Sequence, residues 1–374
     1  NPYVLEEPGL IVPEGVTLAI EPGVIVKAES SVTSLTVEGV LVAAGTDASP
    51  VIFTSLTDDE GGDTNGDGAA TQPAPGDWAG ITIQDAASQS RLEYVVMRYG
   101  GTDAQPLLLV SDSSPAVSHA EVTEFTGDAG VVVRGSTAQP TISLSSITAG
   151  TTGVIYEEGA AGELSGSTLS GHEYDGIDIY DTCSPEIRQN DISSNGYDGI
   201  YFDGGASVAA VSDNVLADNG LYAIDVYDDA APVLEGNSGS GNAYNAICLT
   251  GDRSENEEWL LKADGFPYLI DWYYSIGPDA SVEFESGSVV KSDGGRLDIS
   301  GALLASGSAL DRVVFTSVND DFHGGDTLDD GSQTSPSAED GAAISVEPGG
   351  QLTMAHTDVL YGGGNVFQAL ACPT

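Results

Sequence analysis

Basic residues are scarce in this sequence: 374 residues contain 10 lysines and arginines against 58 aspartates and glutamates, a formal net charge of −48. A chain this acidic repels nucleic acid, anionic membranes and acidic polysaccharides, so these partners are excluded. It suits high salt or a medium rich in divalent ions, where cations screen the self-repulsion. Only three lysines occur, Lys27, Lys262 and Lys291, which fits a salt-adapted surface.

Long hydrophobic runs and a cysteine framework are also missing. No stretch of about 18 consecutive apolar residues occurs, so the sequence predicts no membrane span in this segment. Three cysteines are too few for a disulfide scaffold. No signal peptide is present and the first residue is Asn1 rather than methionine, so we expect a processed chain or an excerpt of a longer one.

What the sequence does contain is a repeat of about 23 residues through its centre. One apolar position recurs in every repeat, at Val131, Val154, Ile177, Ile200, Ile224 and Ile247. A second recurs two residues later, at Val133, Tyr156, Ile179, Phe202, Val226 and Leu249. Period-2 alternation means that one face of each segment is buried. The longer period predicts turns of a solenoid rather than a globular core.

Asparagine and small residues recur with the same spacing. The asparagines form two columns, Asn190, Asn214 and Asn237, and then Asn195, Asn219 and Asn242. Equal positions of stacked coils lie about 4.8 Å apart, so these side chains are expected to bond to the coils above and below. One tight corner per coil is marked by Gly130, Gly153, Gly176, Gly199, Ala223 and Ala246.

The stretch PEIRQNDISSNGYDGIYF resembles the common repeat of the right-handed parallel β-helix, the pectate-lyase-like architecture found in bacterial and archaeal surface proteins and adhesins. The resemblance covers residues 106–251 closely and extends more loosely upstream through GVIVKAE, SPVIFTS and WAGITIQ. The sequence therefore predicts an all-β fold: a right-handed parallel β-helix solenoid with coils of about 23 residues and long acidic loop insertions.

A longer period lies over the first. The segment NPYVLEEPGLIVPEGVTLAIEPGVIVKAE resembles FPYLIDWYYSIGPDASVEFESGSVVKSD, and Phe53 matches Phe315 at a step of 262. We therefore expect a β-helix unit over residues 1–251, a connecting segment over 252–265, and the start of a second, incomplete unit over 266–374.

The acidic stretch TDDEGGDTNGDGAATQPAPGDWAG is a long insertion between two coils. Asp63, Asn65 and Asp67 have the 1-3-5 spacing of an EF-hand-like calcium loop, and the match resembles dockerin-type calcium loops. The glutamate expected at position 12 is absent, because Ala74 stands there. The candidates for the missing oxygens are Asp58, Asp59 and Asp77. We expect calcium here, with a solvated acidic loop as the alternative.

The second copy of this loop departs from the first. DRVVFTSVNDDFHGGDTLDDG resembles SPVIFTSLTDDEGGDTNGDG, but Leu328 replaces Asn65. Either the second site is lost, or it is rebuilt from nearby acids. The candidate ligands are Asp320, Asp321, Asp326, Asp329 and Asp330.

Outward positions between the buried ones carry acids and tyrosines. Tyrosine beside aspartate can bind a neutral sugar through ring stacking and acceptor bonds. Paired carboxylates about 5–10 Å apart can hydrolyse glycosides, and a plain solvated acidic wall is the third alternative. The carbohydrate-binding candidates are Asp178, Tyr180, Tyr201, Asp203, Asp225 and Tyr227.

The catalytic motifs of β-helix enzymes are not evident. Lyases acting on uronates need basic residues, and none of the seven arginines stacks beside another in the central coils. The β-helix hydrolase family carries Asn-x-Asp, Asp-Asp, Gly-His-Gly and Arg-x-Lys motifs, whereas His172 stands in Gly-His-Glu and no Arg-x-Lys occurs. We therefore name no catalytic residue, and expect the four histidines at surface or turn positions.

These observations favour a structural and adhesive segment of a large extracellular or cell-surface repeat protein, stabilised by calcium. Its partners would be a neutral glycan or neighbouring copies of itself, assembled into a filament or stalk. The alternative is a carbohydrate-active enzyme, a glycoside hydrolase or lyase acting on a neutral glycan.

The cysteines test the proposed register. Cys183 lies nearly three levels from Cys248, about 14 Å along the axis, which is too far for a disulfide. A step of 263 places Cys372 on the outward column of Cys248, four levels on. The intervening positions are expected to be Val289, Val314 and Ser345. We predict no disulfide within the chain.

Overall fold

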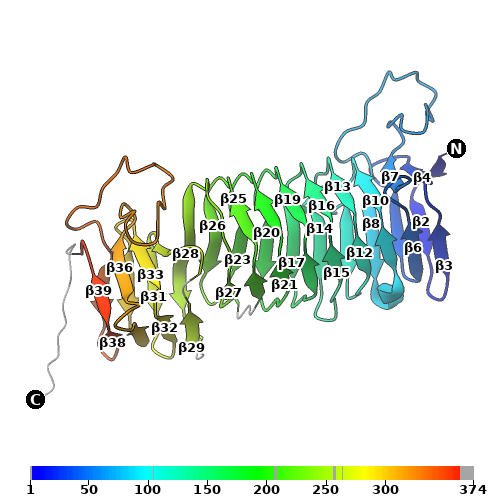
Figure 1. The fold of residues 1–374 in the computed structure, drawn as a ribbon. Coiled ribbons are helices and arrows are strands. Elements are labelled where there is room, and N and C mark those ends of the chain that lie inside the picture. The colour runs from blue at the N-terminus through cyan, green and yellow to red at the C-terminus, as the bar shows by residue number, and fades with distance from the viewer. Residues whose placement is uncertain (1, 104, 206–208, 256–257, 263, 363–374) are drawn as a thin grey trace, which may run out of the picture. The chain divides into compact units, whose positions relative to one another are not determined.

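The computed structural model describes residues 2–362 apart from 104, 206–208, 256–257 and 263. The chain divides into two compact units, Asn1–Tyr197 (unit 1) and Asp198–Thr374 (unit 2). Both are built from stacked parallel strands (Figure 1). Within the described residues, the only helical element is the short 3-10 helix η1 (Asp85–Gln89). The predicted all-β solenoid is therefore confirmed.

Unit 1 winds three parallel sheets around one apolar core. Sheet A contains β1 (Tyr3–Leu5), β4 (Ile25–Ala28), β7 (Val51–Ser55), β10 (Val95–Arg98), β13 (Glu121–Thr123), β16 (Ser146–Thr148), β19 (Thr168–Ser170) and β22 (Asp191–Ser193). Sheet B contains β2 (Gly9–Val12), β5 (Ser34–Val37), β8 (Gly80–Gln84), β11 (Leu108–Ser111), β14 (Ala129–Arg134), β17 (Thr152–Glu157) and β20 (Ile177–Tyr180). Sheet C contains β3 (Thr17–Ile20), β6 (Val40–Ala44), β9 (Arg91–Glu93), β12 (Ala116–Ser118), β15 (Thr141–Ser143), β18 (Glu163–Ser165) and β21 (Glu186–Arg188).

Unit 2 is built in the same way. One sheet contains β23 (Ile200–Asp203), β26 (Tyr222–Tyr227), β28 (Tyr244–Arg253), β30 (Tyr268–Ile270), β33 (Val289–Ser292), β36 (Val313–Ser317) and β39 (Thr357–Val359). The end of β28 also pairs with a second sheet, β31 (Tyr273–Ile276), β34 (Arg296–Ile299) and β37 (Ala343–Val346). The third contains β29 (Glu258–Leu261), β32 (Ser281–Glu285), β35 (Ala302–Ser306) and β38 (Gln351–Ala355). The remaining strands are β24 (Ala210–Ser212), β25 (Val215–Ala217) and β27 (Val233–Glu235).

The predicted inward columns are confirmed within each unit. In unit 1 the first column runs through Val131, Val154 and Ile177. In unit 2 it runs through Ile200, Ile224 and Ile247. All six side chains are buried. Successive coils therefore stack apolar side chains directly on one another, and this burial holds the coils together.

The asparagine columns form hydrogen-bonded ladders, as predicted. In unit 2, the backbone and side-chain N–H groups of Asn214 both donate to Asn237 Oδ1, at 3.2 and 3.0 Å. Asn219 makes the same pair of bonds to Asn242 Oδ1, at 3.0 and 2.9 Å. In unit 1, Asn190 Nδ2 donates to a backbone carbonyl of the preceding coil at 2.9 Å. Each ladder satisfies polar groups that would otherwise be buried without a partner.

The column that follows Cys248 differs from the prediction. Instead of Val289, Val314 and Ser345, it continues through Leu269, Lys291 and Thr316. The reason is that β30 pairs directly with β28, so Leu269 is the next residue of the column. The predicted column was counted from matching positions of the two sequence copies and did not include the β30 level. Cys183 and Cys248 are buried and neither forms a disulfide, and Cys372 lies outside the described residues.

Candidate functional site

An apolar column lies on the outward face of sheet B in unit 1. Leu109, Val132 and Ile155 pair in register from β11 through β14 to β17. Although these side chains point away from the core, they are 8%, 2% and 9% exposed. They form an apolar cluster with Ala129, and Tyr180 packs against it. The outward face of sheet B is therefore apolar here, and we call this apolar surface the floor.

A groove with a volume of about 550 Å³ lies over this floor. We call it the sheet B groove. It is lined by Gly127, Asp128, Val132, Thr151, Thr152, Ile155, Glu157, Tyr174, Asp175, Asp178 and Tyr180. The lining residues include four acids and two tyrosines, and no lysine or arginine. The groove therefore offers aromatic rings, hydroxyl groups and carboxylate acceptors above an apolar surface.

Three contacts order the side chains of the groove. Tyr180 Oη donates to Asp178 Oδ2 at 3.3 Å. The ring of Tyr174 packs against that of Tyr197, with 5.8 Å between the centroids. At the edge, Arg134 Nη2 lies 2.5 Å from Glu157 Oε1. Glu157 is thus engaged in an ion pair, whereas Asp178 is held by a tyrosine hydroxyl.

The predicted carbohydrate-binding residues are divided between the units. Asp178 and Tyr180 belong to unit 1 and line the sheet B groove, beside Thr152 and Ile155. The other four belong to unit 2, where the register of β23 and β26 pairs them as Tyr201 with Asp225 and Asp203 with Tyr227. The alternation of tyrosine and aspartate that we predicted is therefore present on adjacent strands within unit 2.

The outward wall of unit 2 ends in an apolar cluster. Cys248, which follows Asp225 in register, is buried together with Leu269 and Val318. Leu328, the residue that replaces Asn65 in the second copy, packs against the same cluster. The substitution therefore lets the second loop close over apolar side chains.

Sequence reasoning missed part of the sheet B groove. Tyr174 and Asp175 line it from the turn ahead of β20. A signal for them exists, because Tyr174-Asp175-Gly is repeated 23 residues later as Tyr197-Asp198-Gly. Turn residues that recur at the coil period are expected to project from the same edge of the sheet.

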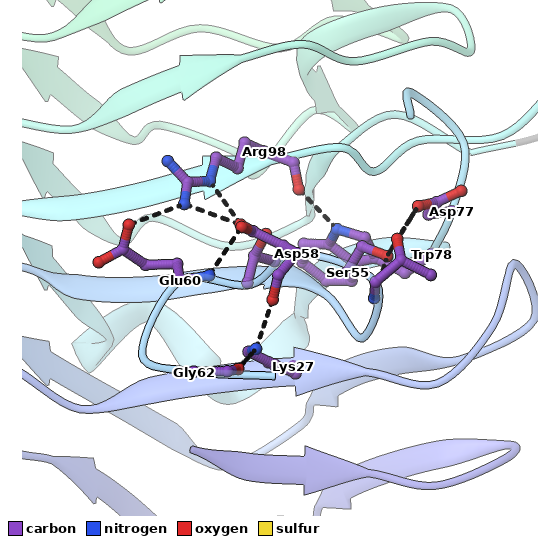
Figure 2. Close-up of polar contacts among 10 residues, drawn as sticks. Lys27, Ser55, Asp58, Glu60, Gly62, Asp77, Trp78 and Arg98 are labelled. Atoms are coloured by element: carbon purple, nitrogen blue, oxygen red, sulfur yellow. Dashed lines mark hydrogen bonds and ion pairs between the residues drawn. The ribbon is translucent and has the colours of Figure 1, made fainter. Parts of the chain in front are cut away.

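A buried lysine anchors the first acidic loop, residues 57–77. Lys27 points outward from β4 and is covered by the loop, so that it is fully buried. Its Nζ donates to the backbone carbonyl of Asp58 and to that of Gly62, the latter at 3.0 Å. Figure 2 shows these contacts. The ammonium group therefore ties the start of the loop to the solenoid wall.

The carboxylate of Asp58 completes this anchor (Figure 2). Its Oδ2 accepts from Thr54 Oγ1 at 2.6 Å and from Arg98 Nη2 at 2.7 Å, and its Oδ1 accepts from the Glu60 N–H at 3.0 Å. Burial raises the pKa of Asp58, but these hydrogen bonds and the charge of Arg98 outweigh it, so the pKa lies below its usual value. At the other end of the loop, Asp77 Oδ2 accepts from Ser55 Oγ at 2.7 Å.

The EF-hand-like residues lie at the exposed tip of the first acidic loop. Asp63 Oδ1 accepts the Gly66 N–H at 2.7 Å, and Asp67 Oδ1 accepts the Ala70 N–H at 2.9 Å. Asn65 Nδ2 donates to Asp67 Oδ2 at 3.0 Å. Asp59 is exposed at the start of the loop. The predicted ligands are therefore placed in three separate positions: the Asp58 anchor, the tip, and the Asp77 exit.

The second acidic loop, residues 318–342, repeats the lysine contact. Lys291 is fully buried, and its Nζ donates to the carbonyls of Asp320 and Gly325 at 2.9 and 2.6 Å. Asp320 Oδ2 accepts from Thr316 Oγ1 at 2.6 Å and lies 2.8 Å from His323 Nδ1. The same anchor is therefore built twice in the chain, with a histidine in place of the arginine.

Three carboxylates converge in the second acidic loop. Asp321, Asp326 and Asp330 are half-buried, and their oxygens lie within 4.8 Å of one another. Burial lowers the pKa of Lys291 to about 8, while the charges of Asp320, Asp321 and Asp326 act in the opposite direction. Residues 57–77, all of which the structure describes, contain no such group. Asp320 itself stays outside the cluster, because its carboxylate serves the anchor.

The comparison with known families confirms the resemblance to the β-helix. A family model described as "Right handed beta helix region" matches residues 107–257, and this region of the chain is therefore a right-handed β-helix. No curated protein matches the sequence significantly. In the part of the chain that the structure describes, no helix is long and apolar enough to cross a membrane.

Several solved structures show a distant similarity to this chain. The Agl-KA catalytic domain is 14% identical with a TM-score of 0.42, and the match covers 90% of this chain and 61% of that domain. The mannuronan C-5 epimerase AlgE4 A-module of Azotobacter vinelandii is 12% identical with a TM-score of 0.36, covering 97% and 89%. The catalytic domain of a GH87 alpha-1,3-glucanase in complex with nigerose is 10% identical with a TM-score of 0.35, covering 96% and 63%. The epimerase and the glucanase are carbohydrate-active by name, and at such identities the likeness concerns the fold alone.

Proposed function

We propose that unit 1 recognises a neutral glycan in the sheet B groove. The observation that carries this proposal is the combination in one groove of an apolar floor, two tyrosines and four acids. Sugar rings present apolar C–H faces that pack on aromatic rings, and hydroxyl groups that donate to carboxylates. Tyr180 supplies both kinds of contact, because it packs on the floor and holds Asp178 Oδ2 at 3.3 Å.

The glycan is proposed to be neutral because of charge. The groove lining has four acids, Asp128, Glu157, Asp175 and Asp178, and no lysine or arginine. At its edge Arg134 pairs with Glu157. A chain of uronates would add further negative charge to a protein whose formal net charge is −48. Like charges at such short range cost several kcal/mol. A neutral chain meets no such penalty.

Replacing Tyr180 with alanine is expected to weaken the binding of a neutral oligosaccharide by roughly tenfold, because the ring contributes about 1.4 kcal/mol through stacking. Electrophoresis through gels that contain neutral glucans would identify a binding polysaccharide, and calorimetry with its oligosaccharides would measure the dissociation constant. Tyr174→Ala should act in the same direction. Trp272→Ala, which removes a 78% exposed ring from unit 2, is the matched control.

The same preparations separate binding from catalysis. If wild-type protein releases reducing ends from a neutral glycan and Asp178→Asn does not, then the carbohydrate-active enzyme is the correct function. If Trp272→Ala loses the glycan while Tyr174→Ala and Tyr180→Ala retain it, the sheet B groove is not the binding site and the proposal is wrong.

We also propose that the second acidic loop binds calcium. Carboxylate oxygens are the hard donors that calcium prefers, and Asp321, Asp326 and Asp330 bring three of them within 4.8 Å. Two of these carboxylates are already ordered, since Asp326 Oδ2 accepts the Gly331 N–H at 2.8 Å and Asp330 Oδ1 accepts the Gln333 N–H at 2.8 Å. The chemistry and the closeness of these donors support calcium as the ion.

Calcium at about 100 times its dissociation constant is expected to raise the free energy of unfolding by about 2.7 kcal/mol. Asp326→Asn should abolish this gain, because it removes a charged ligand from the cluster. Thermal unfolding with calcium and with chelator measures the effect, and Asp63→Asn in the first acidic loop is the matched control. A gain that survives Asp326→Asn but is lost in Asp63→Asn would move the site to the first acidic loop.

At the level of the whole protein, we propose a glycan-binding, adhesive segment of a large repeat protein located outside the cell or on its surface. The restart of the sequence repeat near Phe266 supports a tandem array. The large negative charge, with only 10 basic residues, supports a location rich in salt or divalent ions.

A further inference from the structure

The first coil of unit 1 exposes several apolar side chains. In a solenoid, a neighbouring coil would cover side chains at these positions. Tyr3, Val4 and Leu10 are 66%, 40% and 39% exposed. Together with Leu18 and Phe53 they line an apolar cavity of about 470 Å³. Its lining comes from β1, β2, β3 and the strands stacked on them, at the end of unit 1 that carries the N-terminus (Figure 1).

The strands of this coil are paired on one side only. Within the described residues, β1 pairs with β4, β2 with β5 and β3 with β6, and no strand pairs with their opposite edges. Three parallel edges at one end of a solenoid are a template for further strands. We call this end of unit 1, formed by residues 3–20, the N-terminal face.

The second copy of the repeat shows what covers an equivalent face. Register fixes the equivalence, because Tyr3 pairs with Val26 just as Tyr268 pairs with Val290. In the same way, β2 pairs with β5 as β31 pairs with β34. By this register the equivalent pairs are Tyr3 and Tyr268, Val4 and Leu269, and Leu10 and Tyr274.

The equivalent side chains of the second copy are buried. Tyr268, Leu269 and Tyr274 are 1%, 0% and 1% exposed. Strand β28 covers them: Ile247 pairs with Tyr268 and Gly251 with Tyr274. The strand β29 covers the third sheet, where Trp259 pairs with Val282, the counterpart of Leu18. The same sequence unit is therefore capped by a coil in one copy and bare in the other.

We propose that the N-terminal face docks a further parallel β-coil of the type that contributes β28 and β29, supplied in cis by polypeptide joined directly ahead of the face. The coil adds one strand edge to each of β1, β2 and β3 and fills the apolar cavity with side chains in the places of Ile247, Trp259 and Leu261. This inference is independent of the glycan proposal, since it concerns the other end of unit 1.

The test extends the chain by one coil. A copy of residues 233–265 is joined ahead of Asn1. The copied Gly265 then stands as many residues before Tyr3 as the native Gly265 stands before Tyr268. Hydrogen exchange of the amides in β1, β2 and β3 is then compared with that of the chain as it stands. We expect exchange in these strands to slow by about tenfold or more, toward the protection of β30, β31 and β32.

A matched extension in which the copies of Ile247 and Trp259 are aspartate should leave the exchange of β1, β2 and β3 unchanged. The proposal is overturned if the native extension, whether or not it becomes protected itself, fails to slow exchange in these strands. It is also overturned if the unextended chain dimerises through this face, seen as concentration-dependent protection that Leu10→Asp removes. In that case a second copy is the occupant.

Discussion

Replacing Asn242 with leucine is expected to lower the free energy of unfolding by about 3 kcal/mol, because several buried polar groups lose their partners at once. Asn242 Oδ1 accepts from both the backbone and the side-chain N–H of Asn219, at 3.0 and 2.9 Å. Its Nδ2 donates to the Leu216 carbonyl at 3.0 Å. Leucine has a similar volume but offers none of these bonds. The loss of stability therefore measures the hydrogen bonds of the ladder separately from apolar packing.

Urea denaturation of the two proteins measures this loss. Asn65→Ala removes an exposed asparagine from the first acidic loop and should change the free energy of unfolding by a few tenths of a kcal/mol at most. A midpoint for Asn242→Leu equal to that of the control would mean that the ladder contributes no net stability, and that apolar stacking alone sets the register.

His172 is expected to make the chain sensitive to acid. It is buried, its Nε2 lies 3.1 Å from the Ile147 carbonyl, and its Nδ1 has no hydrogen-bond partner among the described residues. Burial lowers its pKa to about 4, and the bond to Ile147 offsets this only in part. Between pH about 6.5 and about 4 the unfolded chain therefore binds a proton that the folded chain does not. Stability falls through this window as the pH falls, by about 3 kcal/mol.

The replacement His172→Asn should remove this pH dependence. His172 stands on the column of Asn195, whose Oδ1 already accepts the His172 N–H at 3.3 Å. An asparagine there has no proton to gain, and its Nδ2 can donate to the Ile147 carbonyl as Asn190 does in the neighbouring column to Leu164. The variant should therefore lose about 2 to 3 kcal/mol less than the wild type between pH about 7 and about 4.5.

Urea denaturation at the two pH values gives this difference directly. His356→Asn, which replaces an exposed histidine of unit 2, serves as the control and should follow the wild type. If His172→Asn and the wild type lose stability in parallel on acidification, then His172 is protonated in the folded state, and its burial does not have the effect described.

The coils could be predicted because burial imposes a period on the sequence. A side chain that faces the core at one level faces it again about 23 residues later, and the columns of Val131 and Ile200 obey this rule. The asparagine columns were predictable for the same reason, since a ladder works only when equal residues recur at each level. The exception is His172, which was expected at the surface or in a turn and is a buried member of such a column.

The sheet B groove could be predicted only in part. Asp178 and Tyr180 stand out in the alternation of β20, but the floor beneath them does not. Val132 and Ile155 lie in apolar runs in which inward and outward positions are both apolar, so the period-2 pattern that separates the two faces is lost. The contribution of Tyr174 depends on how a turn projects over the sheet, which composition alone does not determine.

The acidic loops show the same limit. Ligand spacing predicted a metal site at Asp63 in the first loop and left open whether the second site was lost or rebuilt from nearby acids. Three of those acids, Asp321, Asp326 and Asp330, are the carboxylates that converge. Whether acids meet depends on how a loop closes, and closure here depends on residues outside the loop. The matching lysines of VIVKAE and SVVKSD, Lys27 and Lys291, are the signal that both loops share an anchor.

The two anchors leave the protein with unusual surface chemistry. Two of its three lysine side chains are sealed beneath loops, and Lys262 is exposed. Reagents that acylate primary amines would thus find one accessible side chain, apart from the α-amino group of the polypeptide. A fluorophore, a cross-linker or a sensor surface coupled through Lys262 would therefore attach to the side chains of every molecule at the same point, without an engineered tag.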